Sequence, residues 1–163
     1  LTGKDFGVVD VHNRYIANPK HPNVKDPPQI FEIGMRETLS RLQKANKKVV
    51  FVLDVPEIGF EPKNCLHGNR GRPLRLNNKL PKSPCAVPRK EFETRNKIYR
   101  DLVTSIAKDY PNVTIFDAAA PFCDDEWCWA MKDGQMLYRD DDHLSVDGSK
   151  FLAKELIKVL STQ

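Results

Sequence analysis

The stretch "KKVVFVLDVP", residues 47–56, decides the fold class of this 163-residue chain. Five apolar residues run from Val49 to Leu53, and three of them are valines, which favour strands because their side chains branch at Cβ. An uninterrupted apolar run predicts a strand buried on both faces, and such strands belong to parallel sheets covered by helices. Asp54 follows directly, at the strand end where open parallel sheets place their ligand sites.

The flanking segments predict an alternation of strands and helices within a single domain that spans residues 1–163. The apolar run Phe6–Val11 and the sequence "NVTIFDAA", residues 112–119, predict two further strands, which place Asn13 and Asp117 at or near strand ends. Apolar residues recur every three or four positions in three segments, which predicts amphipathic helices. These are residues 29–45, with Pro28 in the first turn, residues 89–110, and residues 146–160, with Ser145 as N-cap and Leu152, Leu156, Val159 and Leu160 facing inward. This order predicts an α/β layered fold with a parallel sheet.

A long irregular insertion is predicted at residues 57–87. Basic residues concentrate in and just after it: His67, Arg70, Arg72, Arg75, Lys79, Lys82, Arg89 and Lys90. Such a stretch fits either a solvated basic loop or a contact with an anionic glycan, a membrane surface or nucleic acid. We favour the solvated loop and expect no nucleic-acid partner, because no aromatic side chains on which bases could stack are interleaved with the charges.

The four cysteines fall into two apparent pairs, Cys65 with Cys85 and Cys123 with Cys128. Zinc sites prefer closely spaced pairs, often with nearby histidines, and the wide spacing of the first pair does not fit. Each pair instead brackets a loop rich in Pro, Gly, Asn or acidic residues. We therefore expect two disulfides rather than zinc ligands or free thiols, which implies an oxidising compartment.

A histidine follows three aspartates in "YRDDDHLSVDGSKFLA", residues 138–153. The spacing lets Asp140 reach one ring nitrogen of His143, which would fix the tautomer and stabilise the imidazolium. Asp141 and Asp142 are expected to face solvent or to support the backbone and the next helix.

Two other interpretations of this motif remain open. In one, it is an acidic loop whose histidine only caps or hydrogen-bonds. In the other, Asp140, Asp142 and His143 bind a metal, although three ligands from four adjacent residues would be cramped. The remaining histidines are isolated in the sequence, at positions 12, 21 and 67.

A family resemblance favours the catalytic interpretation. "LYRDDDHLSVDGSKFLA", residues 137–153, resembles the last block of the SGNH (GDSL-type) hydrolase superfamily, in which D-x-x-H supplies the acid and base of a Ser-His-Asp triad. More narrowly, four further segments resemble the extracytoplasmic SGNH domain of bacterial acyltransferase family 3 (AT3) proteins. They are the insertion with Cys65 and Cys85 and the stretches "VVFVLDVPEIGF", "CAVPRKEFETRN" and "PFCDDEWC". The resemblance covers about residues 6–160 and implies a three-layer α/β/α fold of the flavodoxin-like kind.

The resemblance implies that His143 is a general base, Asp140 its orienting carboxylate and Asn13 an oxyanion donor. Asn13 also fits a residue that ends a strand by turn chemistry, and its neighbours depart from the Gly-x-Asn pattern of the superfamily. The Gly-Asp-Ser block with the nucleophile is absent, and "DGS", residues 147–149, lies inside a predicted helix. Only the last three of about five family strands are found. We therefore expect a C-terminal part of a longer domain, whose first strand–helix–strand unit carries the serine.

The function implied is an O-acyltransferase, in particular an O-acetyltransferase, acting on a bacterial surface glycan such as lipopolysaccharide or peptidoglycan. The resemblance further implies a periplasmic domain tethered to the inner membrane, an acyl donor supplied by a membrane-embedded domain of the same polypeptide, and no metal or cofactor. This chain alone is expected to be inactive without the serine. The alternatives are an SGNH carbohydrate esterase and a non-catalytic glycan-binding or assembly module.

Overall fold

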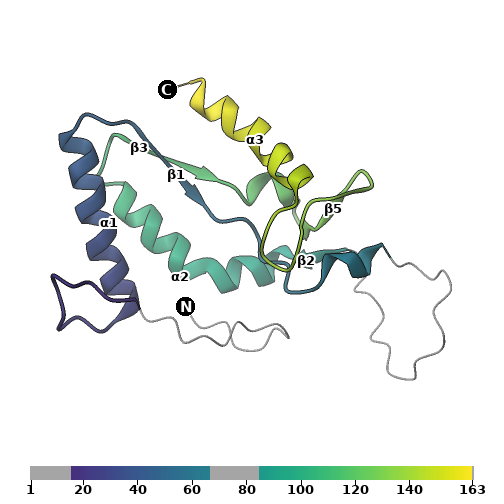
Figure 1. The fold of residues 1–163 in the computed structure, drawn as a ribbon, viewed down its shortest axis with the longest axis horizontal. Helices are drawn as coiled ribbons and strands as arrows, with labels where there is room; N and C mark the ends of the chain where they lie inside the picture. Colours follow the sequence, from purple (N-terminus) through teal and green to yellow (C-terminus); the bar gives the residue numbers. More distant parts are fainter. Residues whose placement is uncertain (1–15, 67–84, 163) are drawn as a thin grey trace.

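The structure, a computed structural model, describes residues 16–66 and 85–162. The predicted strand Phe6–Val11, Asn13 and most of the expected insertion lie outside the described residues. The described helices are α1 (Pro27–Lys44), α2 (Arg89–Ala107) and α3 (Val146–Leu160), with short 3₁₀ helices η1 (Pro62–Cys65) and η2 (Ala120–Phe122) (Figure 1). The strands are β1 (Val49–Leu53), β2 (Ala86–Pro88), β3 (Val113–Asp117), β4 (Trp127–Trp129), β5 (Met131–Lys132) and β6 (Gln135–Met136).

The central feature of the fold is the parallel pair formed by β1 and β3; the sequence predicted both strands and a parallel sheet. Their register runs from Val49 opposite Val113 to Leu53 opposite Asp117. Both carboxyl ends therefore reach the same edge of the sheet. The other described strands form short antiparallel pairs, β2 with β4 and β5 with β6.

The helix starts follow from local capping. The Asp26 side chain accepts a hydrogen bond from the backbone N–H of Gln29 at 3.1 Å, so α1 begins at Pro27, two residues before the predicted start. Ser145 caps α3, as predicted, because its hydroxyl accepts the N–H of Gly148 at 3.0 Å. None of the described helices is both long and apolar enough to cross a bilayer.

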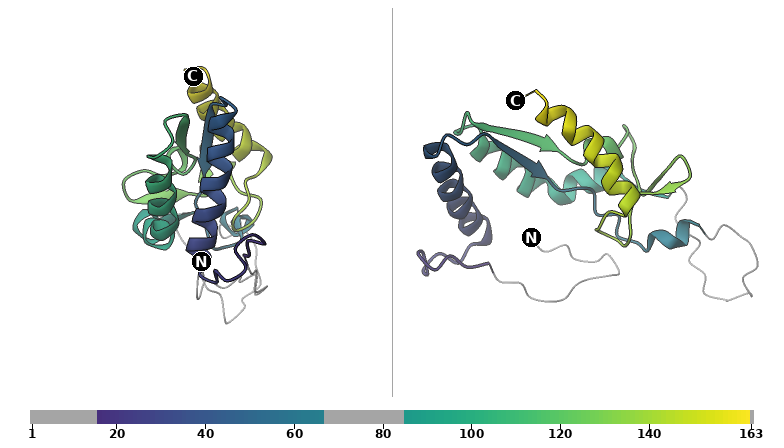
Figure 2. Two further views of the ribbon diagram at one scale, coloured as in Figure 1. Left: turned by 90° about the vertical axis from the view of Figure 1, so that its left-hand side faces the viewer. Right: turned by 45° about the horizontal axis from the view of Figure 1, so that its top comes forward.

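The main core lies where α1 and α2 pack against the β1–β3 pair. Its buried members come from α1, α2, β1 and the loop after α2: Met35, Leu39, Leu53, Val103, Ile106 and Tyr110. The Tyr110 hydroxyl donates to the Arg36 carbonyl at 3.1 Å, which ties the end of α2 to α1. Figures 1 and 2 show α2 running along one side of the strands while α3 lies on the other side.

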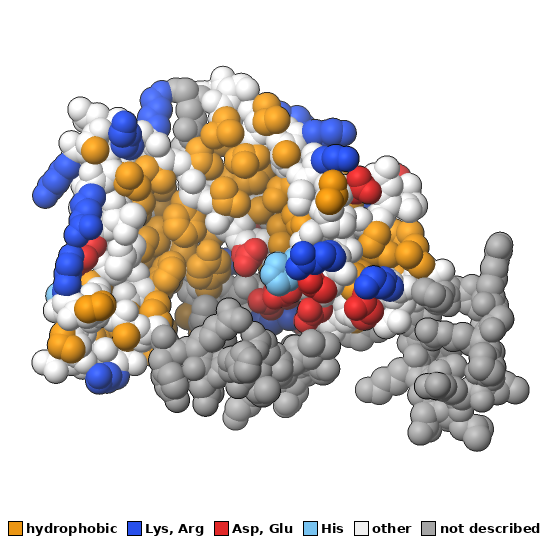
Figure 3. Space-filling model, in the orientation of Figure 1, with side chains coloured by type: hydrophobic (Ala, Val, Ile, Leu, Met, Phe, Trp, Pro, Cys, Tyr) orange, Lys and Arg blue, Asp and Glu red, His pale blue; other side chains and the backbone are white. Residues whose placement is uncertain are grey.

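The sheet face toward α3 is more open than the sequence predicted. Leu53 is the buried residue of β1, whereas Val52 is 43% exposed, so the expectation of a strand buried on both faces was wrong. The expected inner face of α3 is also poorly covered: Leu152, Leu156 and Val159 are half-buried and Leu160 is 51% exposed. The physical reason is that α3 is held mainly at its first turn, and the described residues place no further strand beside β1. A broad hydrophobic area is therefore visible on this side (Figure 3).

Candidate active site

The two ends of the site loop, residues 137–145, are joined to each other by backbone hydrogen bonds. Ser145 N–H donates to the Leu137 carbonyl at 2.9 Å, and Arg139 N–H donates to the His143 carbonyl at 2.8 Å. The Ser145 hydroxyl adds a bond to the Met136 carbonyl at 2.7 Å. Because these bonds fix the backbone on either side of the histidine, the loop presents His143 from a defined position.

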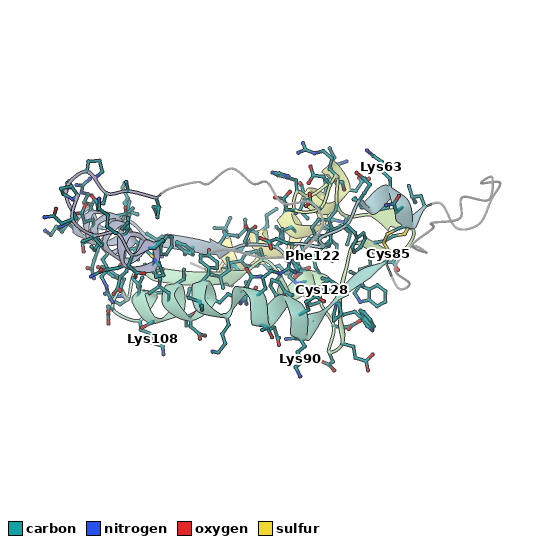
Figure 4. The ribbon with its side chains drawn as sticks, turned by 90° about the horizontal axis from the view of Figure 1, so that it is seen from below. Lys63, Cys85, Lys90, Lys108, Phe122 and Cys128 are labelled. Atoms are coloured by element: carbon teal, nitrogen blue, oxygen red, sulfur yellow. A yellow bond between two sulfur atoms is a disulfide. The ribbon has the colours of Figure 1, made fainter. Side chains whose placement is uncertain are left out.

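The same loop is anchored to the segment that follows β1. The N–H groups of Ile58 and Gly59 donate to the Asp141 carbonyl at 2.8 and 3.3 Å. Leu137 and Tyr138, the first two residues of the loop, are buried, and the Phe122 and Tyr138 rings pack edge to face with their centroids 5.8 Å apart. Figure 4 labels Phe122 near the centre of this packed region. Backbone pairing and apolar packing thus hold the loop against the carboxyl edge of the sheet.

Gly148 explains why "DGS" occurs at residues 147–149. A Cβ at this position would lie 1.9 Å from the Leu137 carbonyl oxygen and 2.8 Å from its carbon, so only glycine lets α3 approach the loop this closely. The glycine therefore serves packing. It does not form part of a nucleophile block.

Asp140 and His143 are brought together as the sequence predicted. The Asp140 Oδ1 atom lies 2.9 Å from His143 Nδ1 and accepts the His143 backbone N–H at 2.8 Å. The Asp140 Oδ2 atom accepts from the Arg139 guanidinium at 3.1 and 3.2 Å. With Asp140 ionised, Nδ1 of His143 carries the proton, and Nε2 of the neutral ring is left free to accept one.

The pKa values of the pair move in the directions expected of a hydrogen-bonded acid and base. Partial burial opposes ionisation of Asp140, but hydrogen bonds from the backbone and ring of His143 hold its pKa well below the usual range. The hydrogen bond to Asp140, followed by the charge of Asp142, raises the pKa of His143. The imidazolium is therefore stabilised where it stands, which is what a general base in acyl transfer requires.

Asp142 lies closer to His143 than the acid–base interpretation of the sequence predicted, and only the metal interpretation had placed it beside the ring. It was expected to support the backbone or face solvent, but its Oδ1 atom lies 2.7 Å from His143 Nδ1. The adjacency of Asp142 to the histidine was visible in the sequence. The turn that folds its side chain back onto the ring was not.

His143 borders a hollow of about 390 Å³ at the carboxyl end of β1 and just beyond that of β3. Its lining includes Asp54, Tyr99, Ala118, Asp142, His143 and Leu152. Asp54 was expected near such an edge. Figure 3 shows acidic side chains gathered around a histidine beside the hydrophobic area. Asp117, also flagged from the sequence, has a structural role: it pairs with Arg100 and accepts the Ala119 N–H at 3.0 Å.

A metal ion fits this cluster poorly. Asp140, Asp142 and His143 offer ligand atoms that all lie within 4.8 Å of one another. However, Nδ1, the ring nitrogen that faces both carboxylates, already makes a hydrogen bond to Asp140. The contacts are accounted for by an acid–base pair, and we assign no metal to them.

No serine of the described residues makes a hydrogen bond to His143. Ser145 is engaged as the cap of α3, and the Ser40 hydroxyl lies 3.0 Å from that of Tyr110, in the core. Asn13 lies outside the described residues, so its expected oxyanion role remains a prediction.

Both disulfides have the expected pairing. Cys65 joins Cys85 and Cys123 joins Cys128, each with an S–S distance of 2.01 Å. Figure 4 shows Cys85 and Cys128 in the same part of the molecule as Phe122. Cys128 belongs to β4, which pairs with β2 immediately after Cys85. The two links therefore staple neighbouring segments next to the site loop.

We compared the chain with known protein families and solved structures. A family model described as "SGNH domain (fused to AT3 domains)" matches residues 3–158. The structure is similar to that of the lipopolysaccharide acetyltransferase periplasmic domain of Salmonella ser. Paratyphi A, with a TM-score of 0.53 and 15% sequence identity. The match covers 82% of this chain and 50% of that chain, so this chain corresponds to about half of it. No curated protein matches the sequence.

The structural match supports the fold alone, and this fold is the α/β architecture expected from the sequence. The family model covers nearly the whole chain. The chain therefore belongs to the family of SGNH domains that are fused to AT3 domains.

Proposed function

We propose that this chain is the C-terminal part of an O-acyltransferase domain that acetylates a bacterial cell-surface glycan through a Ser-His-Asp mechanism. His143 removes the proton of a serine as the serine attacks an acyl donor, and the same imidazole then activates the glycan hydroxyl that receives the acyl group. Asp140 holds the imidazole in the productive tautomer. The reaction needs no metal or cofactor.

The observation that carries the proposal is the 2.9 Å contact between Asp140 and His143 Nδ1, beside a hollow at the carboxyl end of β1. Open α/β sheets bind their ligands at this edge. The carboxylate of Asp140 is itself held in place by the backbone N–H groups of Asp142 and His143 and by the Arg139 guanidinium, so its position beside the ring is fixed.

The serine is proposed to come from a segment outside this chain. Three features of the described residues support a further segment beside the site. Val52 of β1 is 43% exposed, the hydrophobic face toward α3 is open, and the Tyr138 hydroxyl is buried without a hydrogen-bond partner among the described residues. Burying an unpaired hydroxyl is costly, so a neighbouring segment that supplies a partner would stabilise the loop.

The acceptor and location are proposed from the relatives. The solved neighbour is a periplasmic domain of a lipopolysaccharide acetyltransferase, and the family is fused to AT3 domains. The two disulfides are consistent with an oxidising compartment such as the periplasm. The acyl donor is then delivered by the fused membrane domain.

Acetyl transfer by the intact protein tests the proposal. Acetyl release from a donor is measured with and without purified glycan acceptor, for the native protein and for His143→Ala and Asp140→Asn variants. We expect acceptor-dependent transfer that both variants lose. Acetyl release without transfer would favour the esterase. Full glycan acetylation by His143→Ala would instead favour a non-catalytic glycan-binding or assembly module.

A further inference from the structure

Two carboxylates approach the same ring nitrogen of His143, which is one more than a Ser-His-Asp triad uses. Asp140 Oδ1 lies 2.9 Å from Nδ1 and Asp142 Oδ1 lies 2.7 Å from it. Asp140 meets the geometry of a hydrogen bond, whereas Asp142 makes a close charge contact. The two residues therefore differ in what they can do for the imidazole.

Asp140 is built to hold the ring in place. Its oxygens accept the backbone N–H groups of Asp142 and His143, the Nδ1–H of the ring and the Arg139 guanidinium. These donors fix the carboxylate in space, and the adjacent guanidinium offsets part of its charge. Asp140 thus supplies orientation but only part of a full negative charge.

Asp142 has the opposite character. Its side chain is 53% exposed, and among the described residues no backbone N–H donates to its carboxylate. Partial burial, and then the neighbouring carboxylates of Asp140 and Asp141, raise the pKa of Asp142, while the charge of His143 lowers it. A carboxylate in this position stabilises the protonated ring without determining its orientation.

We propose that Asp142 raises the basicity of His143 by supplying a second negative charge at Nδ1, and so shifts the pH range in which the site works. This inference rests on the proposed function, because it assigns a second carboxylate to the same general base. Asp142 need not touch the substrate; it acts through the imidazole.

None of the other charged and titratable groups described around His143 supplies a second negative charge at Nδ1. On the site loop these are Arg139, which opposes protonation of the ring, and Asp141, whose carbonyl anchors the loop. From β1 and α2 the hollow receives Asp54 and Tyr99. Among these groups, Asp140, Asp142 and Arg139 act on the titration of His143, and Asp142 has the largest effect after the hydrogen bond to Asp140.

The sign of the expected change follows from the charge. Replacing Asp142 by Asn removes a negative charge next to the imidazole, so the pKa of His143 falls. A general base must be unprotonated in the free enzyme, so the acidic limb of the kcat/KM profile moves to lower pH. For an ion pair this exposed we expect a displacement of roughly 0.2–0.7 of a pH unit.

The experiment measures pH profiles of acetyl transfer by the intact protein for the native form and for Asp142→Asn, Asp142→Glu and Asp141→Asn. We expect the acidic midpoint to move down in Asp142→Asn, to return toward the native value in Asp142→Glu, and to stay closer to native in the matched control Asp141→Asn. A loss of folding would lower activity at every pH without moving the midpoint. If Asp142→Asn does not fold, Asp142→Ser replaces it in the same comparison.

The outcome separates this inference from the proposed function. If His143→Ala retains transfer, the general-base assignment itself is wrong. If His143→Ala is inactive while Asp142→Asn keeps the native midpoint, the base stands and the role of Asp142 is refuted. A midpoint in Asp141→Asn that moves as far as in Asp142→Asn would also refute it, because the effect would then reflect general charge in the loop.

Discussion

Replacing Gly148 by alanine is expected to destabilise the protein through one backbone contact. The added Cβ would lie 1.9 Å from the Leu137 carbonyl oxygen, where a relaxed contact needs more than 3 Å, so α3 or the site loop must move by over an ångström. Neither can yield easily, because Leu137 N–H donates to the Ala130 carbonyl at 2.9 Å and Leu137 O accepts from Ser145 at 2.9 Å.

The magnitude follows from two opposing effects. Overpacking against an unyielding backbone costs about 1–3 kcal/mol, and alanine regains up to about 1 kcal/mol of helix propensity over glycine. The difference is a net loss of up to about 3 kcal/mol in the free energy of unfolding. Because the shift displaces the His143 loop, acetyl transfer should fall as well.

Gly34 provides the matched control, since it also lies within a helix, α1, and a Cβ there would meet nothing within 4 Å. Denaturant unfolding of the intact protein compares Gly148→Ala with Gly34→Ala, which should be neutral or up to about 1 kcal/mol more stable. Equal stability of the two variants would refute the assignment of Gly148 to close packing.

Three further predictions concern stability. Ser145→Ala removes the cap of α3 and a side-chain bond to the loop, so denaturant unfolding should show a loss of about 1–2 kcal/mol; no loss would contradict the capping assignment. Replacing both cysteines of a disulfide by serine should cost about 3 kcal/mol of stability for Cys65–Cys85, whose sequence separation is 20, and about 2 kcal/mol for Cys123–Cys128, whose sequence separation is 5, because the longer loop loses more entropy on closure. A larger loss for the Cys123–Cys128 variant in thermal unfolding would contradict this order. The pKa of Asp140 is lower in the folded than in the unfolded chain, so its stabilisation is present above about pH 4 and is lost as the pH falls through the folded value. The Asp140→Asn variant should therefore have a lower free energy of unfolding than the native protein near pH 7, and the difference between the two should shrink as the pH falls below 4. A difference in the free energy of unfolding that does not change with pH would contradict this.

The local pattern of the sequence was sufficient to predict the strands β1 and β3, the three described helices and the Ser145 cap. Each depends on residues close in sequence, such as the run Val49–Leu53. The same local pattern predicted the contact between Asp140 and His143, because both residues lie in one short loop.

The rest depends on contacts between distant segments. The run Val49–Leu53 predicts burial on both faces, but burial requires neighbours, and the described residues cover one face only. The glycine in "DGS" could be explained only once Leu137 was found against it. The position of Asp142 follows from how the loop turns, which spacing alone does not specify.

The central claim is that Asp140 and His143 activate a serine located outside this chain. Its most direct test is mass spectrometry of the intact protein after brief incubation with an acyl donor, for the native form and for His143→Ala. The account predicts one acetyl group on a serine outside residues 1–163 of the native protein, and no such adduct in the variant. An acetyl group on Ser149, or an undiminished adduct in His143→Ala, would contradict it.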